Sequence, residues 1–234
     1  MALRPRTGIE AAVKSLRPMA PLLALGLAAC AAGPVAPDWQ ADAHQAITAY
    51  TRAYLEGRDR VATQELALAR RAVARTGKPS TVAAVELKAC ALRFASLGGG
   101  DCPGFAALAA DADAASRAYG AYLAGSGPGS DPALLPPVQA DVLRGSLHSE
   151  GLRAIADPLS RLVAAAALLR AGRLAPQGIA VAIDTAAEQG WARPLAAWLS
   201  FDRDRLRTAG DEAGAGARQR RLDLILGTAR EVAP

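Results

Sequence analysis

Apolar residues recur at steps of three and four positions along most of the chain after residue 37, which is the spacing of one face of an α-helix. Glycine and proline interrupt this pattern at intervals, and these residues commonly end and begin helices. The interruptions leave about nine expected helices: residues 38–57, 60–76, 79–97, 105–122, 137–147, 158–171, 176–189, 194–206 and the segment after residue 210. Because short turns join most of them, we expect antiparallel hairpins in an irregular bundle or a short α-solenoid.

Three segments give more specific predictions. Asp157 followed by Pro158 is a helix start, since an acidic side chain caps free backbone N–H groups and proline fits the first helical position. Asp38 is expected to cap the first helix. The segment 79–97 carries apolar residues on two sides, which predicts a central helix covered by several neighbours.

The segment 125–132, with the sequence GSGPGSDP, shows the least helical pattern in the chain. It is either a domain boundary or a flexible loop between two helical halves. We favour the loop, because each half alone would have only a thin core. Residues 38–234 are therefore expected to form a single domain.

The composition strengthens the helical prediction. Aromatic residues make up only 4% of the chain, so the core must be built from alanine, leucine and valine. Alanine has the highest helix propensity, whereas strands favour β-branched and aromatic residues. The predicted fold class is all-α. The paired helices resemble tetratricopeptide-like hairpins in architecture, without the regular spacing of Trp, Gly, Tyr and Pro that such repeats carry.

Residues 1–29 have the three zones of a secretory signal. A basic segment comes first, an apolar run from Leu22 to Ala29 follows, and small residues precede Cys30. The apolar run is much shorter than the roughly 20 residues that cross a bilayer as a helix. This pattern predicts export of the remainder of the chain.

The stretch Leu27-Ala28-Ala29-Cys30 resembles the lipobox of bacterial lipoproteins. This resemblance implies that residues 1–29 are a cleaved signal peptide, that Cys30 carries the lipid, and that residues 30–37 are a membrane-anchored tether. The residue after the cysteine is Ala31 rather than Asp, which implies the periplasmic face of the outer membrane. A cleaved signal with an unmodified Cys30 is the alternative.

Two further cysteines, Cys90 and Cys102, would remain in the exported domain. In an oxidising compartment an even pair is expected to form a disulfide, here between one helix and the loop that opens the next. The alternatives are two buried free thiols or a redox pair. The redox interpretation lacks the C-x-x-C spacing of such sites.

Charge and motifs exclude several function classes. The net charge of +5 includes +3 from residues 1–29, which leaves about +2 for the exported domain and gives no reason to expect nucleic-acid binding. The two histidines, His44 and His148, have no ligand-spaced partners, so we expect no metal site. No nucleotide-binding loop or nucleophile elbow is present, and we expect no cofactor.

Two acidic positions and one serine have side-chain types that enzymes use in catalysis. Asp111 and Asp113 point to different sides of a helix because they are two residues apart, which favours solvated charges. Ser160 lies in the first turn of a helix, where a capping interaction is expected. No catalytic residue is predicted.

Trp191 and Arg193 form the candidate partner-binding site. Trp191 falls in an expected turn, and Trp and Arg dominate the energetics of protein interfaces. The alternative is a tryptophan that folds back and locks two helices together.

The expected function is a lipid-anchored periplasmic helical scaffold or adaptor that binds another envelope protein. One alternative is an envelope enzyme that acts on cell-wall material through dispersed acids such as Glu86, Glu150 and Glu188. Another is a helical module that binds a small ligand in a closed apolar cavity.

The anchor can be tested by fractionation. If Cys30 is lipidated, Cys30→Ser should move the protein from the membrane fraction to the soluble fraction, because the acyl chains provide the membrane affinity. Immunoblotting of separated fractions measures this. Unchanged fractionation of the variant would contradict the anchor.

Overall fold

The computed structural model describes residues 37–125 and 129–231, with side chains up to residue 227. All regular secondary structure in this part of the chain is helical and no β-strand occurs in it, which confirms the all-α fold class. None of its helices combines the length and apolar character needed to cross a membrane. Residues 1–36, with the predicted signal peptide, Cys30 and most of the tether, lie outside the described residues, as does the centre of the 125–132 loop.

The helices follow one another with short connections, as the periodicity predicts. They are α1 (Asp38–Leu55), α2 (Asp59–Ala74), α3 (Pro79–Ala95), α4 (Pro103–Ala106), α5 (Ala114–Ala124), α6 (Pro137–Arg144), α7 (Pro158–Arg170), α8 (Pro176–Glu188), α9 (Ala192–Thr208) and α10 (Glu212–Glu231), with 3-10 turns η1 (Ala109–Asp111), η3 (Pro132–Leu134) and η4 (Ser149–Ala154). The pairs α1–α2, α7–α8, α8–α9 and α9–α10 are in contact.

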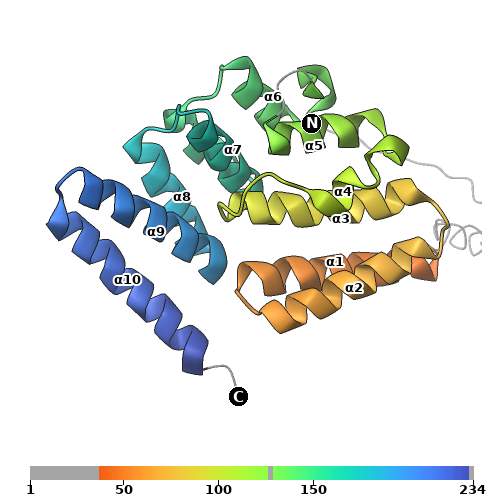
Figure 1. Cartoon of the computed structure of the whole chain (residues 1–234), viewed down its shortest axis with the longest axis horizontal. Helices are drawn as coiled ribbons and strands as arrows, with labels where there is room; N and C mark the ends of the chain where they lie inside the picture. The colour runs from red at the N-terminus through yellow and green to blue at the C-terminus, as the bar shows by residue number, and fades with distance from the viewer. Residues whose placement is uncertain (1–36, 126–128, 232–234) are drawn as a thin grey trace, which may run out of the picture. The chain divides into compact units, whose positions relative to one another are not determined.

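The central helix is α3, as predicted. Figure 1 shows α3 between the α1–α2 hairpin and the helices α4, α5 and α7, all of which it contacts. Helix α3 contacts α7, whose segment Leu162–Leu168 is buried at every position. Trp198 of α9 is fully buried, and its indole N–H donates to the carbonyl of Ala95 at 3.1 Å. The core is therefore built mainly from alanine and leucine around one aromatic anchor.

The start of α7 agrees with its prediction. The Asp157 carboxylate accepts a hydrogen bond from the backbone N–H of Ser160 at 2.7 Å, and Pro158 is the first helical residue. The cap satisfies a backbone donor that the helix itself cannot. At α1 the prediction is wrong, because Asp38 is the first helical residue and Pro37 occupies the cap position without a side-chain hydrogen bond.

The expected helix at residues 105–122 is broken into α4, η1 and α5. The Asp113 carboxylate accepts from the backbone N–H of Ser116 at 2.6 Å, so it caps a new helix instead of continuing the preceding one. An aspartate competes well with helix continuation because its short side chain bonds to nearby backbone groups. Asp113 is therefore a capping residue as well as an exposed charge, while Asp111 lies at the exposed end of η1.

Two further boundaries differ from the predictions. The helix expected at 137–147 ends at Arg144, because Gly145 takes a left-handed conformation with φ of 85°. The turn η4 follows and had no predicted counterpart. Helix α9 begins at Ala192 with Trp191 in its cap position, two residues before the expected start at Pro194.

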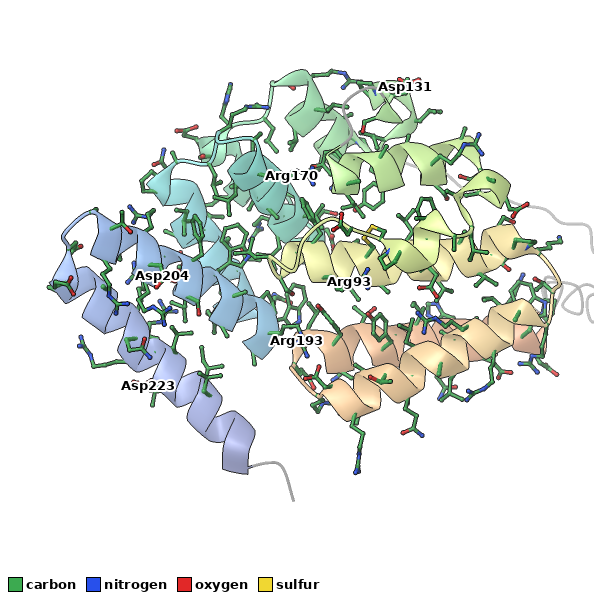
Figure 2. The ribbon with its side chains drawn as sticks, in the orientation of Figure 1. Arg93, Asp131, Arg170, Arg193, Asp204 and Asp223 are labelled. Carbon is green, nitrogen blue, oxygen red and sulfur yellow. A yellow bond between two sulfur atoms is a disulfide. The ribbon has the colours of Figure 1, made fainter. Side chains whose placement is uncertain are left out.

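Arginine side chains join helix ends that are distant in sequence. Arg170 of α7 donates to the carbonyl of Tyr122 at 2.6 Å, and Arg173 donates to the carbonyl of Val142 at 3.0 Å. The last carbonyls of a helix have no partner within it and carry its negative dipole end, so a guanidinium satisfies them well. Figure 2 shows Arg170 between α7 and α5.

Helix α10 is held on α9 by a buried carboxylate. The Asp202 side chain is 5% exposed, and it accepts hydrogen bonds from Arg205 on its own helix and from Arg218 on α10, each at 2.8 Å. Ala215 and Leu222 of α10 are buried beside this network. These contacts orient α10 on α9.

Cys90 of α3 and Cys102, which precedes α4, lie at disulfide distance with their Cα atoms 5.5 Å apart. Both cysteines are buried. This placement confirms that the predicted pair can bridge the end of the central helix to the next segment.

Removal of the disulfide should weaken the fold. In a Cys30→Ser background, the additional changes Cys90→Ser and Cys102→Ser are expected to lower the free energy of unfolding by about 2–3 kcal/mol, because the bridge restricts the unfolded chain. Urea denaturation measures the loss. Labelling of both thiols in denatured, unreduced Cys30→Ser protein would show that the bridge does not form.

The Asp202 network gives a second prediction. Asp202→Ala should lower the free energy of unfolding by about 1–3 kcal/mol, because it removes the buried acceptor of two arginines. Asp204→Ala is the matched control, since Asp204 on the same helix also pairs with arginine but is 59% exposed. Denaturation and amide hydrogen exchange in α10 should change for Asp202→Ala only. Equal effects of the two variants would refute this role.

Candidate functional site

A groove follows the surface of the α1–α2 hairpin. Two adjoining hollows of about 840 and 580 Å³ share Gln45 of α1 and Glu65 of α2. We call their combined lining the α1–α2 groove, which comprises Asp42, His44, Gln45, Ala46, Thr48, Ala49, Arg52, Arg58, Val61, Glu65, Leu68, Arg71, Ala72, Ala74 and Arg75.

The floor of the groove is made of small residues and its sides carry apolar ones. Ala46 and Ala72 are buried, whereas Val61 and Leu68 are 36% and 39% exposed. Small residues allow the backbone of a bound segment to approach closely, and the exposed apolar side chains gain free energy when they are covered. The groove is therefore suited to contact another polypeptide.

The rim of the groove is charged. Arg75 pairs with Asp42 across the two helices, and Arg52 pairs with Glu56 at 2.9 Å. Within the described residues, neither Glu65 nor Arg71 forms an ion pair or a side-chain hydrogen bond. Glu65 is partly exposed and Arg71 is exposed, so one acidic and one basic group on α2 can interact with a bound partner.

Arg193 binds within the chain. Figure 2 shows it where the start of α9 meets the α1–α2 hairpin. Its Nε donates to the carbonyl of Tyr54 at 2.7 Å, its guanidinium lies 4.4 Å above the Tyr54 ring, and it pairs with Asp59. Burial raises the pKa of Tyr54, so this ring stays neutral beneath the cation. Arg193 therefore joins the C-terminal helices to the first hairpin.

Trp191 has a similar structural position. It is half-buried and packs against two clusters of the core, one around α3 and α7 and one around Tyr50 and Leu55. This geometry corresponds to the alternative in which the tryptophan locks helices together. Partner binding by Trp191 and Arg193 stays a prediction, and the α1–α2 groove offers a more accessible surface.

The three glutamates of the envelope-enzyme alternative lie in separate surroundings. Glu86 of α3 is buried and pairs with Arg70, whose Nη2 lies 2.8 Å from its Oε2. Glu150 of η4 accepts from Gln177 at 2.8 Å, and Glu188 is exposed at the end of α8. Each has its own local partner or solvent, so the structure does not bring them together as one centre.

The remaining candidates occupy surface positions. His44 is exposed on the rim of the groove, and His148 is exposed before η4. Among the described residues, no three metal-ligating side chains gather at one place. Cys30 lies outside the described residues.

The periodicity alone did not reveal the groove. Alanines at positions 46, 49 and 72 look like ordinary helix formers in the sequence. Only the pairing of α1 with α2 brings them into the lining of one groove.

Comparison with known proteins adds no relative to this description: no family model, curated protein or solved structure matches the chain.

Proposed function

We propose that the protein is a lipid-anchored adaptor on the periplasmic face of the bacterial outer membrane, which binds an amphipathic helix of another envelope protein in the α1–α2 groove. The anchor is supported by the resemblance of Leu27-Ala28-Ala29-Cys30 to a lipobox. The binding site is supported by one observation, the uncovered groove on the first hairpin.

A helix is the occupant that fits this groove best. The lining on α1 extends from Asp42 to Arg52, ten residues or about 15 Å along the helix axis, which corresponds to about three turns of a bound helix. An amphipathic helix buries its apolar face in such a groove and leaves its polar face in water. Leu68 and Val61 would contact that apolar face.

The charges on α2 define the partner further. Glu65 and Arg71 are six residues apart and therefore about 9 Å apart along the axis. A partner helix with a basic residue near Glu65 and an acidic residue near Arg71 would complement both groups. Such pairs at the edge of an interface mainly select the partner and its orientation.

The tether limits where the partner can lie. Residues 31–37 can extend over at most about 25 Å, and they lead directly into α1. With Cys30 in the membrane, the groove would remain within a short distance of the bilayer. The proposed partner is consequently an envelope protein with a helix close to the membrane surface.

Site-specific crosslinking tests the proposal. A photoreactive amino acid in place of Ala49, on the groove, should crosslink one envelope protein in living cells. Leu68→Glu should reduce this product about tenfold or more, because it places a charge against the partner's apolar face. Leu134→Glu is the control, since Leu134 of η3 is 40% exposed and Leu68 is 39% exposed. The product should be unchanged in this control.

Mass spectrometry of the crosslinked peptide identifies the bound segment. A segment with apolar residues at helical spacing supports the proposed mode of binding. Equal crosslinking with Leu68→Glu and Leu134→Glu would contradict it, as would a crosslinked segment without helical periodicity.

A further inference from the structure

A second cleft lies between α3, α5 and α7, apart from the α1–α2 groove. We call it the Lys88 cleft, and its volume is about 270 Å³. Leu87, Leu159 and Val163 supply apolar walls, and Lys88, Tyr119 and Asp157 supply polar groups. Small-molecule sites combine apolar walls with a few placed polar groups in this way, and volumes begin at about 300 Å³ for drug-sized ligands. The Lys88 cleft is therefore suited to a smaller molecule.

Lys88 is a partly buried cation without a bonded partner. Within the described residues, its ammonium forms no hydrogen bond and no ion pair. Burial lowers the pKa of Lys88, and the attraction of Asp157 opposes this shift less strongly. A desolvated charge of this kind is costly unless an opposite charge binds it. The chain also contains only three lysines beside 24 arginines, and Lys88 is the one that lines this cleft.

Asp157 is fixed in place by its role at the start of α7. Its Oδ2 accepts the Ser160 backbone N–H at 2.7 Å, which holds the carboxylate in its capping position. The other carboxylate oxygen of Asp157, Oδ1, does not take part in the cap. One cation and one anion therefore line the same cleft without bonding to each other.

Tyr119 completes the polar lining. Burial, followed by the nearby Asp157 charge, raises the pKa of Tyr119 to about 12. The phenol is consequently neutral near pH 7 and can donate a hydrogen bond to an anion. Its ring stacks on Tyr122 with the centroids 6.0 Å apart, which limits its movement.

We propose that the Lys88 cleft binds a free amino acid with an apolar side chain. The ligand's carboxylate accepts hydrogen bonds from Lys88 and Tyr119, its ammonium donates to Asp157, and its side chain contacts Leu87 and Val163. A zwitterion matches a cleft that presents one charge of each sign, whereas an anion alone would meet Asp157 and a cation alone would meet Lys88. This site does not depend on the proposed adaptor function.

Calorimetry with leucine and two analogues tests the proposal on the full-length protein. 4-Methylpentanoate lacks the ammonium group of leucine, and 3-methylbutylamine lacks the carboxylate. We expect saturable leucine binding and about 10- to 100-fold weaker binding of either analogue, since each has lost one charge-assisted contact. Lengthening the straight side chain from alanine to norvaline should raise affinity about fourfold per methylene.

Two variants test whether Lys88 binds the carboxylate of the ligand and Asp157 binds its ammonium group. Lys88→Met should weaken leucine binding about 10- to 100-fold and reduce the preference for leucine over 3-methylbutylamine, because only Tyr119 then contacts the carboxylate. Asp157→Asn should remove the preference for leucine over 4-methylpentanoate, while asparagine retains the helix cap. Lys78→Met is the matched control, because Lys78 is an exposed lysine outside the cleft. It should bind leucine as the unaltered protein does.

Thermal unfolding confirms that each variant is folded before its binding is compared. The proposal is overturned if no leucine binding saturates in the millimolar range, or if Lys88→Met binds leucine as tightly as Lys78→Met. It is also overturned if either analogue matches leucine, because the cleft would then recognise only one charge or none.

Discussion

Arginine side chains that donate to main-chain carbonyls hold the helices of this protein in register. Arg170, Arg173 and Arg193 each reach a helix that is distant in sequence and satisfy carbonyls at its C-terminal end. A core of alanine and leucine allows helices to approach closely but offers few large side chains to fix their relative rotation. Polar contacts at the helix ends supply that orientation. Arg170 joins α7 to α5, two of the walls of the Lys88 cleft, and Arg193 attaches the α1–α2 hairpin that carries the groove to the start of α9.

The two proposed binding surfaces illustrate different ways in which a helical domain can recognise a molecule. The α1–α2 groove is long and shallow, with alanines in its lining and a charged rim, which suits a polypeptide helix. The Lys88 cleft is small and carries opposite charges that do not neutralise each other. Each surface includes a cation that forms no ion pair or side-chain hydrogen bond within the described residues, Arg71 in the groove and Lys88 in the cleft.

Helical periodicity predicted the fold class and the central position of α3, and the Asp157-Pro158 capping pattern predicted the start of α7, because these features depend on interactions within one helix or on its apolar face. Periodicity failed at residues 105–122, where the Asp113 cap outcompetes helix continuation. The candidate sites were harder to predict. The groove needs two helices side by side, and the contact that engages Arg193 is formed with Tyr54, 139 residues earlier. The scarcity of lysine was the one signal in the sequence that could have drawn attention to Lys88.

The contact between Arg193 and Tyr54 also constrains the order of folding. The first hairpin can form early because its helices are adjacent in sequence, and local pairs form quickly. Its attachment through this contact must wait until residue 193 has been synthesised and the intervening loop has closed. The entropic cost of closing such a loop grows only slowly with its length. We therefore expect the hairpin that carries the groove to form among the first elements and to gain this contact among the last.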